Sequence, residues 1–419
     1  WEGTGIGGAL NIETPDAFSL GADYSRITSG FNFSELRHER GLNNDGKLLS
    51  AEWANLFNNN QLGVYLSGYF QQRNAAAESI EIGSYSSQQA STDDSVTLPL
   101  HPNDVRFDFY QSSIRRLGGN LAIDWRQSDA KYFVRATYNE YALSGYDVQM
   151  KLGRGETSRY NSDGSFAPQG VTTNGYFQSR DSDETLATFQ LGGSNKLNDT
   201  FSVNYSASAA FSRIQRPDYV ESSINSAISG GDFTFDVANP DNASIVFDSA
   251  ETQAYLLSQD SLRVRKFQGS DDDSRNVMTN GKIEFKWLPD SAFDEVVAGF
   301  IFHHSNRYHH SRPLTGDSGS NFFIPTPDGQ IPDNYNPQGP VASSLDSHAI
   351  SFMDGLITDF PVYERDYFEA SLLPYAYQDL FTSAGVANPG VYSVDDRNRN
   401  TVTGTERTQG AYLVSTKTI

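Results

Sequence analysis

The strongest constraint on the fold of this chain is the recurrence of an apolar residue at every second position. From Phe201 to Ser212 the odd positions are apolar, and all but one of the even positions carry a small polar residue. The segments that begin at Leu62, Tyr132 and Ile283 alternate in the same way. Such alternation is typical of strands with one apolar and one polar face, and no window of similar length shows a helical repeat. The sequence therefore predicts an all-β protein.

Short and long connections alternate along the predicted chain of strands. The alternation predicts about ten strands, at 18–28, 47–57, 62–74, 112–126, 132–146, 185–194, 200–214, 276–288, 295–308 and 408–417. Four connections are short turns, at Asn58–Gln61, Gln127–Lys131, Asn195–Asp199 and Pro289–Asp294, and those between them are long, at 75–111, 147–184, 215–275 and 309–407. Short turns at one end and long loops at the other are typical of outer-membrane β-barrels, whereas a soluble sandwich has mixed lengths at both ends.

Three tryptophans lie on strands that lead into the short turns, namely Trp53, Trp125 and Trp287. Large amphipathic rings at one level form an aromatic girdle where a barrel crosses the membrane interface, so we expect these residues there. Core packing explains each of them singly. Charged residues such as Arg126, Arg135 and Glu284 fall on the opposite, polar face and would line a barrel lumen or contact a plug.

Composition and motifs exclude several classes of function. A net charge of −21 argues against a nucleic-acid partner. The absence of cysteine excludes disulfide scaffolds, zinc fingers, iron–sulfur clusters and thiol nucleophiles. The match of Gly3–Gly8 to G-x-G-x-x-G is followed by a predicted strand that stops at Pro15, so a dinucleotide site is not expected. No catalytic motif has the required context, and we expect neither an enzyme nor a cofactor.

Four segments taken together suggest a family. Glu2–Pro15 is a glycine-rich turn that runs into a strand, and Leu62–Arg73, Arg116–Asp129 and Gly281–Phe300 have the pattern of barrel strands and hairpins. In these segments the chain resembles the TonB-dependent receptors of Gram-negative outer membranes. The resemblance implies an antiparallel transmembrane β-barrel of about 22 strands around a plug. Residues 1–17 would then be the C-terminal tail of the plug domain, and 18–419 the N-terminal portion of the barrel.

The resemblance implies a function as well as a fold. It implies TonB-dependent active uptake of a nutrient, a sugar, oligosaccharide or metal chelate, with extracellular loops that capture the substrate. The implied partners are the TonB–ExbB–ExbD complex acting through the plug, outer-membrane lipid and lipopolysaccharide, the nutrient ligand and a surface lipoprotein. Other readings stay open: an outer-membrane adhesin or binding protein, a passive porin, and a secreted β-sandwich lectin or enzyme.

The long connection at about 309–407 is the expected place for substrate contacts, because loops of this length are usually functional or disordered. Its aromatic side chains could stack on sugars or hold a chelate, or could simply pack the loop on itself. The candidate contacts are Tyr308, Arg312, Phe322, Phe323, Tyr335, Tyr363 and Tyr367.

A histidine cluster lies where the same connection begins. His303 and His309 share one face of the predicted strand and are weak candidates for a metal site. A solvated, histidine-rich strand end is the favoured interpretation, and no metal is expected.

Overall fold

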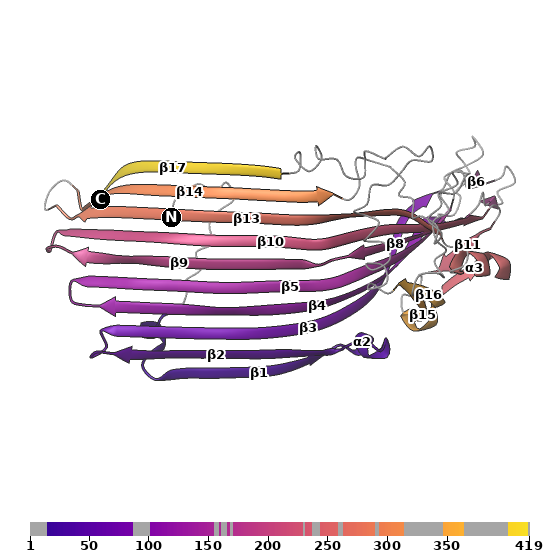
Figure 1. Ribbon diagram of the computed structural model, residues 1–419, viewed down its shortest axis with the longest axis horizontal. Coiled ribbons are helices and arrows are strands. Elements are labelled where there is room, and N and C mark those ends of the chain that lie inside the picture. Colours follow the sequence, from indigo (N-terminus) through magenta and orange to yellow (C-terminus); the bar gives the residue numbers. More distant parts are fainter. Residues whose placement is uncertain are drawn as a thin grey trace.

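The computed structural model describes residues 15–86, 101–154, 159–160, 166–167, 171–228, 231–236, 244–258, 263–289, 293–313, 347–363 and 401–417. One large antiparallel sheet dominates these residues (Figure 1). Its strands are β1 (Tyr24–Phe33), β2 (Asp45–Phe57), β3 (Leu62–Ser86), β4 (His101–Arg126), β5 (Ala130–Arg154), β8 (Val171–Ser179), β9 (Ser182–Lys196), β10 (Phe201–Ile228), β13 (Arg263–Trp287), β14 (Glu295–Pro313) and β17 (Thr401–Thr416).

The sheet is an up-and-down meander in which each strand pairs with the next one along the chain. β8 and β9 both lie between β5 and β10, so they are two parts of one strand position, interrupted at Arg180 and Asp181. The sheet therefore has about ten strand positions, and the predicted antiparallel β fold is confirmed. Among the described residues the sheet is open, with β1 and β17 as its two edges (Figure 1).

The short turns are confirmed at one end of the sheet (Figure 1, left). The turn from β2 to β3 is built from Asn58, Asn59 and Asn60, all with positive φ. Asparagine tolerates this left-handed conformation better than most residues, because its short polar side chain can bond to the local backbone.

The predicted long loops are wrong in their bounds, because the strands continue far into them. β3 runs to Ser86, β5 to Arg154, β10 to Ile228 and β14 to Pro313, and the partner strands begin correspondingly early. The alternation persists there with larger polar residues, as in Val105–Tyr110, and a ladder extends as long as both of its strands alternate. The connections also contain the hairpins β6–β7 (Arg159–Tyr160, Phe166–Ala167), β11–β12 (Phe233–Asp236, Ser244–Phe247) and β15–β16 (Ser347–Phe352, Ile357–Tyr363), with the 3-10 turn η3 (Met353–Gly355) inside the last.

Short helices interrupt the β structure. The predicted first strand, 18–28, is wrong at its start: α1 (Ala17–Leu20) comes first, and β1 begins at Tyr24. Asp16 and Ser19 form a capping box that nucleates α1. α2 (Glu35–Glu39) joins β1 to β2, and α3 (Ala250–Leu257) lies at the long-connection end (Figure 1). None of the helices in the described part of the chain is long and apolar enough to cross a membrane.

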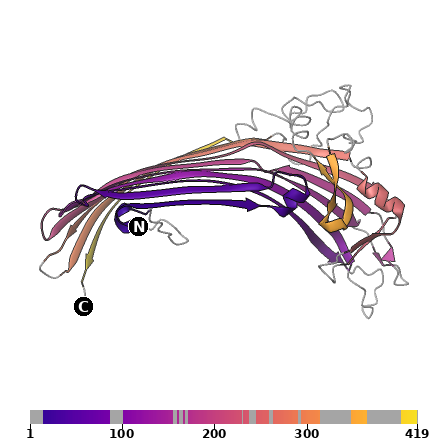
Figure 2. The ribbon, with the colours of Figure 1, turned by 90° about the horizontal axis from the view of Figure 1, so that it is seen from below.

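The sheet is arched, and α1 lies on its concave side (Figure 2). Ala17 of α1 is fully buried against Ala54 of β2, Tyr65 of β3 and Ala122 of β4. These contacts identify the concave face. Side chains alternate across a strand, so the pairing register assigns every other residue of the ladder to one face or the other.

The main core lies on the convex face, at the end of the long connections. Its side chains are 0 to 2 % exposed: Val105, Phe107, Phe109, Val148, Met150, Leu152, Val171 and Phe177. The hairpin β15–β16 covers part of it, with the Phe352 ring edge-on to Phe107 at 5.7 Å between centroids. α3 covers another part, where the Thr173 hydroxyl donates to the Leu256 carbonyl at 2.9 Å. We call this set the convex core.

Candidate functional site

At the short-turn end the same convex face is left uncovered. Its large apolar side chains are 38 to 78 % exposed and come from most strands of the sheet: Ile27, Leu49, Trp53, Phe57, Leu66, Leu117, Trp125, Tyr138, Phe189, Leu191, Phe211, Val277, Phe285, Trp287, Phe300 and Leu413. We call this set the convex belt. Contiguous apolar patches of this extent are rare on soluble monomers and mark surfaces that bind protein or membrane.

The height of the convex belt matches a membrane. On β10 the apolar residues of the convex face run from Phe201, which is half-buried, to Phe211 of the belt, about 34 Å of extended strand. At the tilt of about 35–45° that barrel strands adopt, this length rises about 24–28 Å, against an apolar band of about 25 Å in outer-membrane barrels.

The three predicted girdle residues lie at the short-turn end of the belt, on β2, β4 and β13. Trp53, Trp125 and Trp287 are 39, 44 and 49 % exposed. Further rings extend the row: the ring centroids of Trp125 and Tyr132 are 5.9 Å apart, and those of Trp53 and Phe57 are 6.2 Å apart. The register puts all three on the convex face, and their role as a girdle at a bilayer interface stays a prediction.

Charges appear on the convex face where the belt ends towards the long connections. Arg115 and Glu140 form an ion pair at 3.0 Å. Arg213 and Arg275 both donate to Asp273, and the hydrogen bonds from Arg213 in particular hold the pKa of that carboxyl well below its usual range. Charged side chains therefore border the belt on β4, β5, β10 and β13, whereas on β1 Phe31 and Phe33 remain exposed at and beyond this level.

The concave face is polar at the level of the belt. Asn120 links Ser67 and Thr137 through hydrogen bonds of 3.1 and 3.0 Å. On the same face of β13, Glu284 accepts from the Tyr412 hydroxyl at 2.6 Å and pairs with Lys282 at 2.8 Å. One face is thus suited to lipid or protein and the other to water.

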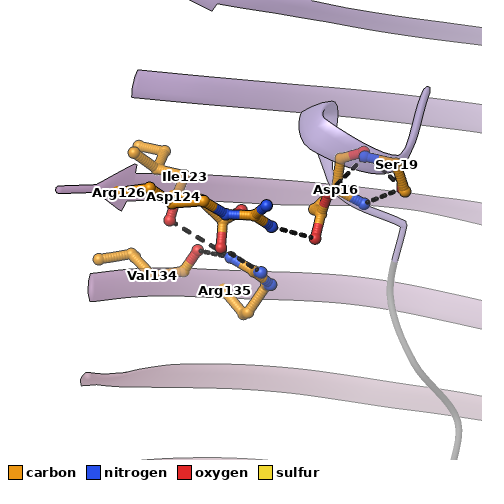
Figure 3. A network of polar contacts seen from close by, with 7 residues as sticks. All are labelled: Asp16, Ser19, Ile123, Asp124, Arg126, Val134 and Arg135. Atoms are coloured by element: carbon orange, nitrogen blue, oxygen red, sulfur yellow. Dashed lines mark hydrogen bonds and ion pairs between the residues drawn. The ribbon is translucent and has the colours of Figure 1, made fainter. Parts of the chain in front are cut away.

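α1 is tied to this polar face by a network that Figure 3 shows. The Arg126 guanidinium donates to Asp16 at 3.3 Å and lies 3.7 Å from the centroid of the Phe18 ring. Next to it, Arg135 donates to the Asp124 carboxylate at 2.7 Å and to two backbone carbonyls of the wall. We call the Asp16–Arg126–Phe18 group the α1 clamp.

Gly63 of β3 makes the close approach of α1 possible. A Cβ atom at this position would lie 2.7 Å from the Phe18 ring and 3.2 Å from the Cβ of Ala17. A side chain here would displace the Phe18 ring or shift α1 away from the sheet, so glycine favours this close approach.

A second polar group lies on the concave face at the long-connection end, behind the convex core. It forms two adjacent rows across the strands. In the first row the register aligns Tyr110, Asp147, Gln178 and Glu221, and in the second Asp108, Gln149 and Tyr176. We call these seven residues the outer-end patch. With ordinary strand spacing it measures about 14 Å across the strands and about 7 Å along them.

The side chains of the outer-end patch bind one another. Gln149 donates to Asp108 at 2.6 Å, and Gln178 donates to the Tyr219 hydroxyl, which in turn donates to Glu221 at 3.0 Å. Arg180 donates to Oδ2 of Asp147 at 2.8 Å, and its guanidinium carbon lies 5.5 Å from the centroid of the Tyr110 ring.

Burial changes the acid–base behaviour of this patch. It raises the pKa of the Asp147 carboxyl, with Arg180 acting in the opposite direction and Asp108 adding to the rise. It also raises the pKa of the Tyr176 and Tyr219 hydroxyls, so both phenols stay neutral and keep their protons. Oδ1 of Asp147 is buried and has no hydrogen-bond partner among the described residues.

The sequence reasoning missed the outer-end patch because 75–111 and 147–184 were predicted as loops. The signal was present: Val105–Tyr110 and Tyr146–Leu152 alternate strictly between apolar and polar residues. Strict alternation on neighbouring strands would have placed Asp108, Tyr110 and Asp147 on one polar face.

Of the predicted substrate contacts, the structure describes the side chain of Tyr308. The Tyr308 ring lies on the convex face, with its centroid 5.8 Å from the Arg275 guanidinium carbon. Arg312 is in β14 and Tyr363 in β16. Phe322, Phe323, Tyr335 and Tyr367 lie outside the described residues. A substrate role for this set stays a prediction.

The two histidines proposed as weak metal candidates each bind a side chain of β13. His303 contacts Asn280 at 2.6 Å, and His309 contacts Ser274 at 2.7 Å. Both share the concave face, as expected, but a separation of six residues on an extended strand is about 20 Å. Within the described residues no group of three or more His, Cys, Asp or Glu side chains is placed to hold a metal ion.

Comparisons with protein-family models, with curated proteins and with solved structures found no match for this chain.

Proposed function

We propose that this chain forms part of the wall of an outer-membrane β-barrel and serves TonB-dependent uptake of a nutrient. The observation that supports the proposal most is the contrast along the convex face. At one end the convex core is buried, with α3 and β15–β16 each covering part of it, and at the other the convex belt is exposed. Lipid is the environment that would cover a belt of this height on all strands at once.

The polar concave face fits the interior of such a barrel. Unpaired strand edges are costly in lipid, so in the proposed barrel β1 and β17 pair with neighbouring strands. The interior then presents the hydrogen-bonded ladder of Asn120, the charges near Glu284 and the α1 clamp. Substrate would enter at the long-connection end, where the outer-end patch lies.

Active transport is favoured over a passive pore by the α1 clamp together with the resemblance to TonB-dependent receptors. In that family the segment before the barrel is the plug, on which the TonB–ExbB–ExbD complex acts. The clamp holds the segment that leads into β1 against the inner wall at Arg126 and Gly63. A pulling force on the segment that precedes α1 would be resisted at the α1 clamp, so the barrel wall would stay in place while the plug rearranges.

Two measurements on the native protein test the proposal. We expect it to stay in the outer-membrane fraction through a carbonate wash and to require detergent for release. In planar bilayers we expect the purified protein to show no steady conductance. Release by carbonate alone would refute the membrane assignment, and a stable open channel would favour a passive porin.

A further inference from the structure

We propose that the outer-end patch binds a neutral oligosaccharide. This inference rests on the proposed function, because it names the class of substrate taken up at this end of the wall. It is drawn from residues that lie outside the long 309–407 connection, where substrate contacts were expected from the sequence.

The first argument is the mixture of donors and acceptors on one flat surface. A sugar hydroxyl both donates and accepts a hydrogen bond, and a sugar ring offers apolar C–H groups to an aromatic face. The patch supplies carboxylates and amides from Asp147, Gln149 and Gln178, and phenols from Tyr110 and Tyr176. Tyrosine combines an apolar body with a polar tip, and a few placed polar groups among such rings are what fix a ligand's orientation.

The second argument is the unpartnered oxygen of Asp147. Arg180 occupies Oδ2, whereas Oδ1 is buried with no hydrogen-bond partner among the described residues. A buried acceptor left unpaired is unfavourable, and a ligand hydroxyl that displaces the side chains covering this oxygen and donates to it would remove the cost. The oxygen belongs to the middle of the first row, between Tyr110 and Gln178.

The third argument concerns the charge of the ligand. The carboxylates of Asp108, Asp147 and Glu221 outnumber Arg180, which disfavours an anionic ligand. The flanking cations Arg106 and Lys151 are paired with Glu81 and Asp104. Each of these carboxylates is already engaged by Gln149, Arg180 or Tyr219, so the patch is not an open set of cation ligands. A neutral, polyhydroxylated molecule matches this balance best.

The rigidity of the patch supports recognition of an extended ligand. The strands β4, β5 and β8 are fixed from behind by the convex core, in which Phe107, Val148 and Phe177 are buried. Sites on strands of a packed sheet hold their geometry better than sites on loops. The first row runs across four strands and the second across three, which suits a chain of sugar units laid over them.

The test uses the purified full chain in detergent and isothermal titration with malto-, cello-, xylo- and manno-oligosaccharides and with ferric hydroxamate and catecholate chelates. We expect at least one oligosaccharide to bind and no chelate to compete. Asp147→Asn removes the charged acceptor and is expected to weaken binding by at least about tenfold. Tyr176→Phe, which deletes one hydroxyl, is expected to weaken it by a few fold.

Tyr69→Phe is the matched control. Tyr69 lies on the same concave face, and its hydroxyl binds Asn139 at 3.2 Å, away from the outer-end patch. It should bind the oligosaccharide as the parent does. The inference is overturned if no oligosaccharide binds, if a chelate binds in its place, or if Tyr69→Phe and Tyr176→Phe behave alike. Carbonate resistance of the same preparations is scored separately, so a failure of the membrane assignment is recognised independently.

Discussion

The substitution Ala207→Lys tests whether the convex belt faces lipid or water. Ala207 is exposed on the convex face near the middle of the belt on β10, four residues from Phe211 and six from Phe201. Because the side chain is small and exposed, the substitution removes no packing and opens no cavity. On a surface in contact with water such a change alters the free energy of unfolding by about 0.5 kcal/mol or less.

In a bilayer the same substitution has a much larger effect. A lysine on the lipid face near the midplane costs about 2–4 kcal/mol, which changes the folding equilibrium by about 30- to 900-fold. The adjacent Ser206→Lys places the same charge on the concave face and should cost about 1 kcal/mol or less. We would measure both by guanidinium titration of protein folded into liposomes, followed by tryptophan fluorescence.

The comparison is internal, because both variants have the same length, charge and strand. Equal costs at positions 206 and 207, or a larger cost at 206, would refute the assignment of the convex face to lipid. A large cost at position 207 in liposomes that vanishes in detergent micelles would not refute this assignment, because micelles adapt to a buried charge.

Three further outcomes are expected. Arg126→Ala should loosen the α1 clamp by about 1 kcal/mol, because the ion pair with Asp16 is partly exposed and the contact with Phe18 is a single cation–π pair. Faster amide exchange at residues 17–20 would show this loss. Unchanged exchange would mean that the packing of Ala17 alone holds α1. Phe107→Ala should destabilise the convex core by about 3–5 kcal/mol in a denaturant titration, and a loss under 1 kcal/mol would mean that Phe352 does not pack there. Oligosaccharide binding should be full at neutral pH and should weaken as the pH falls through the raised pKa of Asp147, because a protonated carboxyl is a weaker hydrogen-bond acceptor. The groups that face this carboxyl are Arg180, Asp108, Tyr110 and Gln178. Asp147→Asn should abolish the pH dependence.

The convex belt was predictable because a period of two is imposed by strand geometry alone. Phe201, Val203 and Tyr205 had to share a face whatever the sheet did next, and the short turns after Phe57 and Arg126 set the register. The three tryptophans follow from the same rule. These features depend only on local periodicity and turn chemistry.

The parts that were missed depend on tertiary contacts. α1 is too short to show a helical repeat, and the Asp16–Ser19 capping pair is its one local sequence signal. Beyond Asn74 and Tyr146 the extended strands are covered by tertiary contacts, with β15–β16 packed on Phe107 and α3 bonded to Thr173. Local alternation puts Asp108, Tyr110 and Asp147 on polar faces of their strands, but only the pairing register of four strands brings the outer-end patch together.

The central claim is that the convex belt faces lipid, and a nitroxide scan of β10 tests it most directly. The chain has no cysteine, so single cysteines from Phe201 to Ser212 can be labelled without background. In proteoliposomes the account predicts that collision with oxygen is high at the odd positions and low at the even ones, with the opposite pattern for a water-soluble nickel complex. Nickel accessibility that is high at Val203, Tyr205 and Phe211 would contradict it.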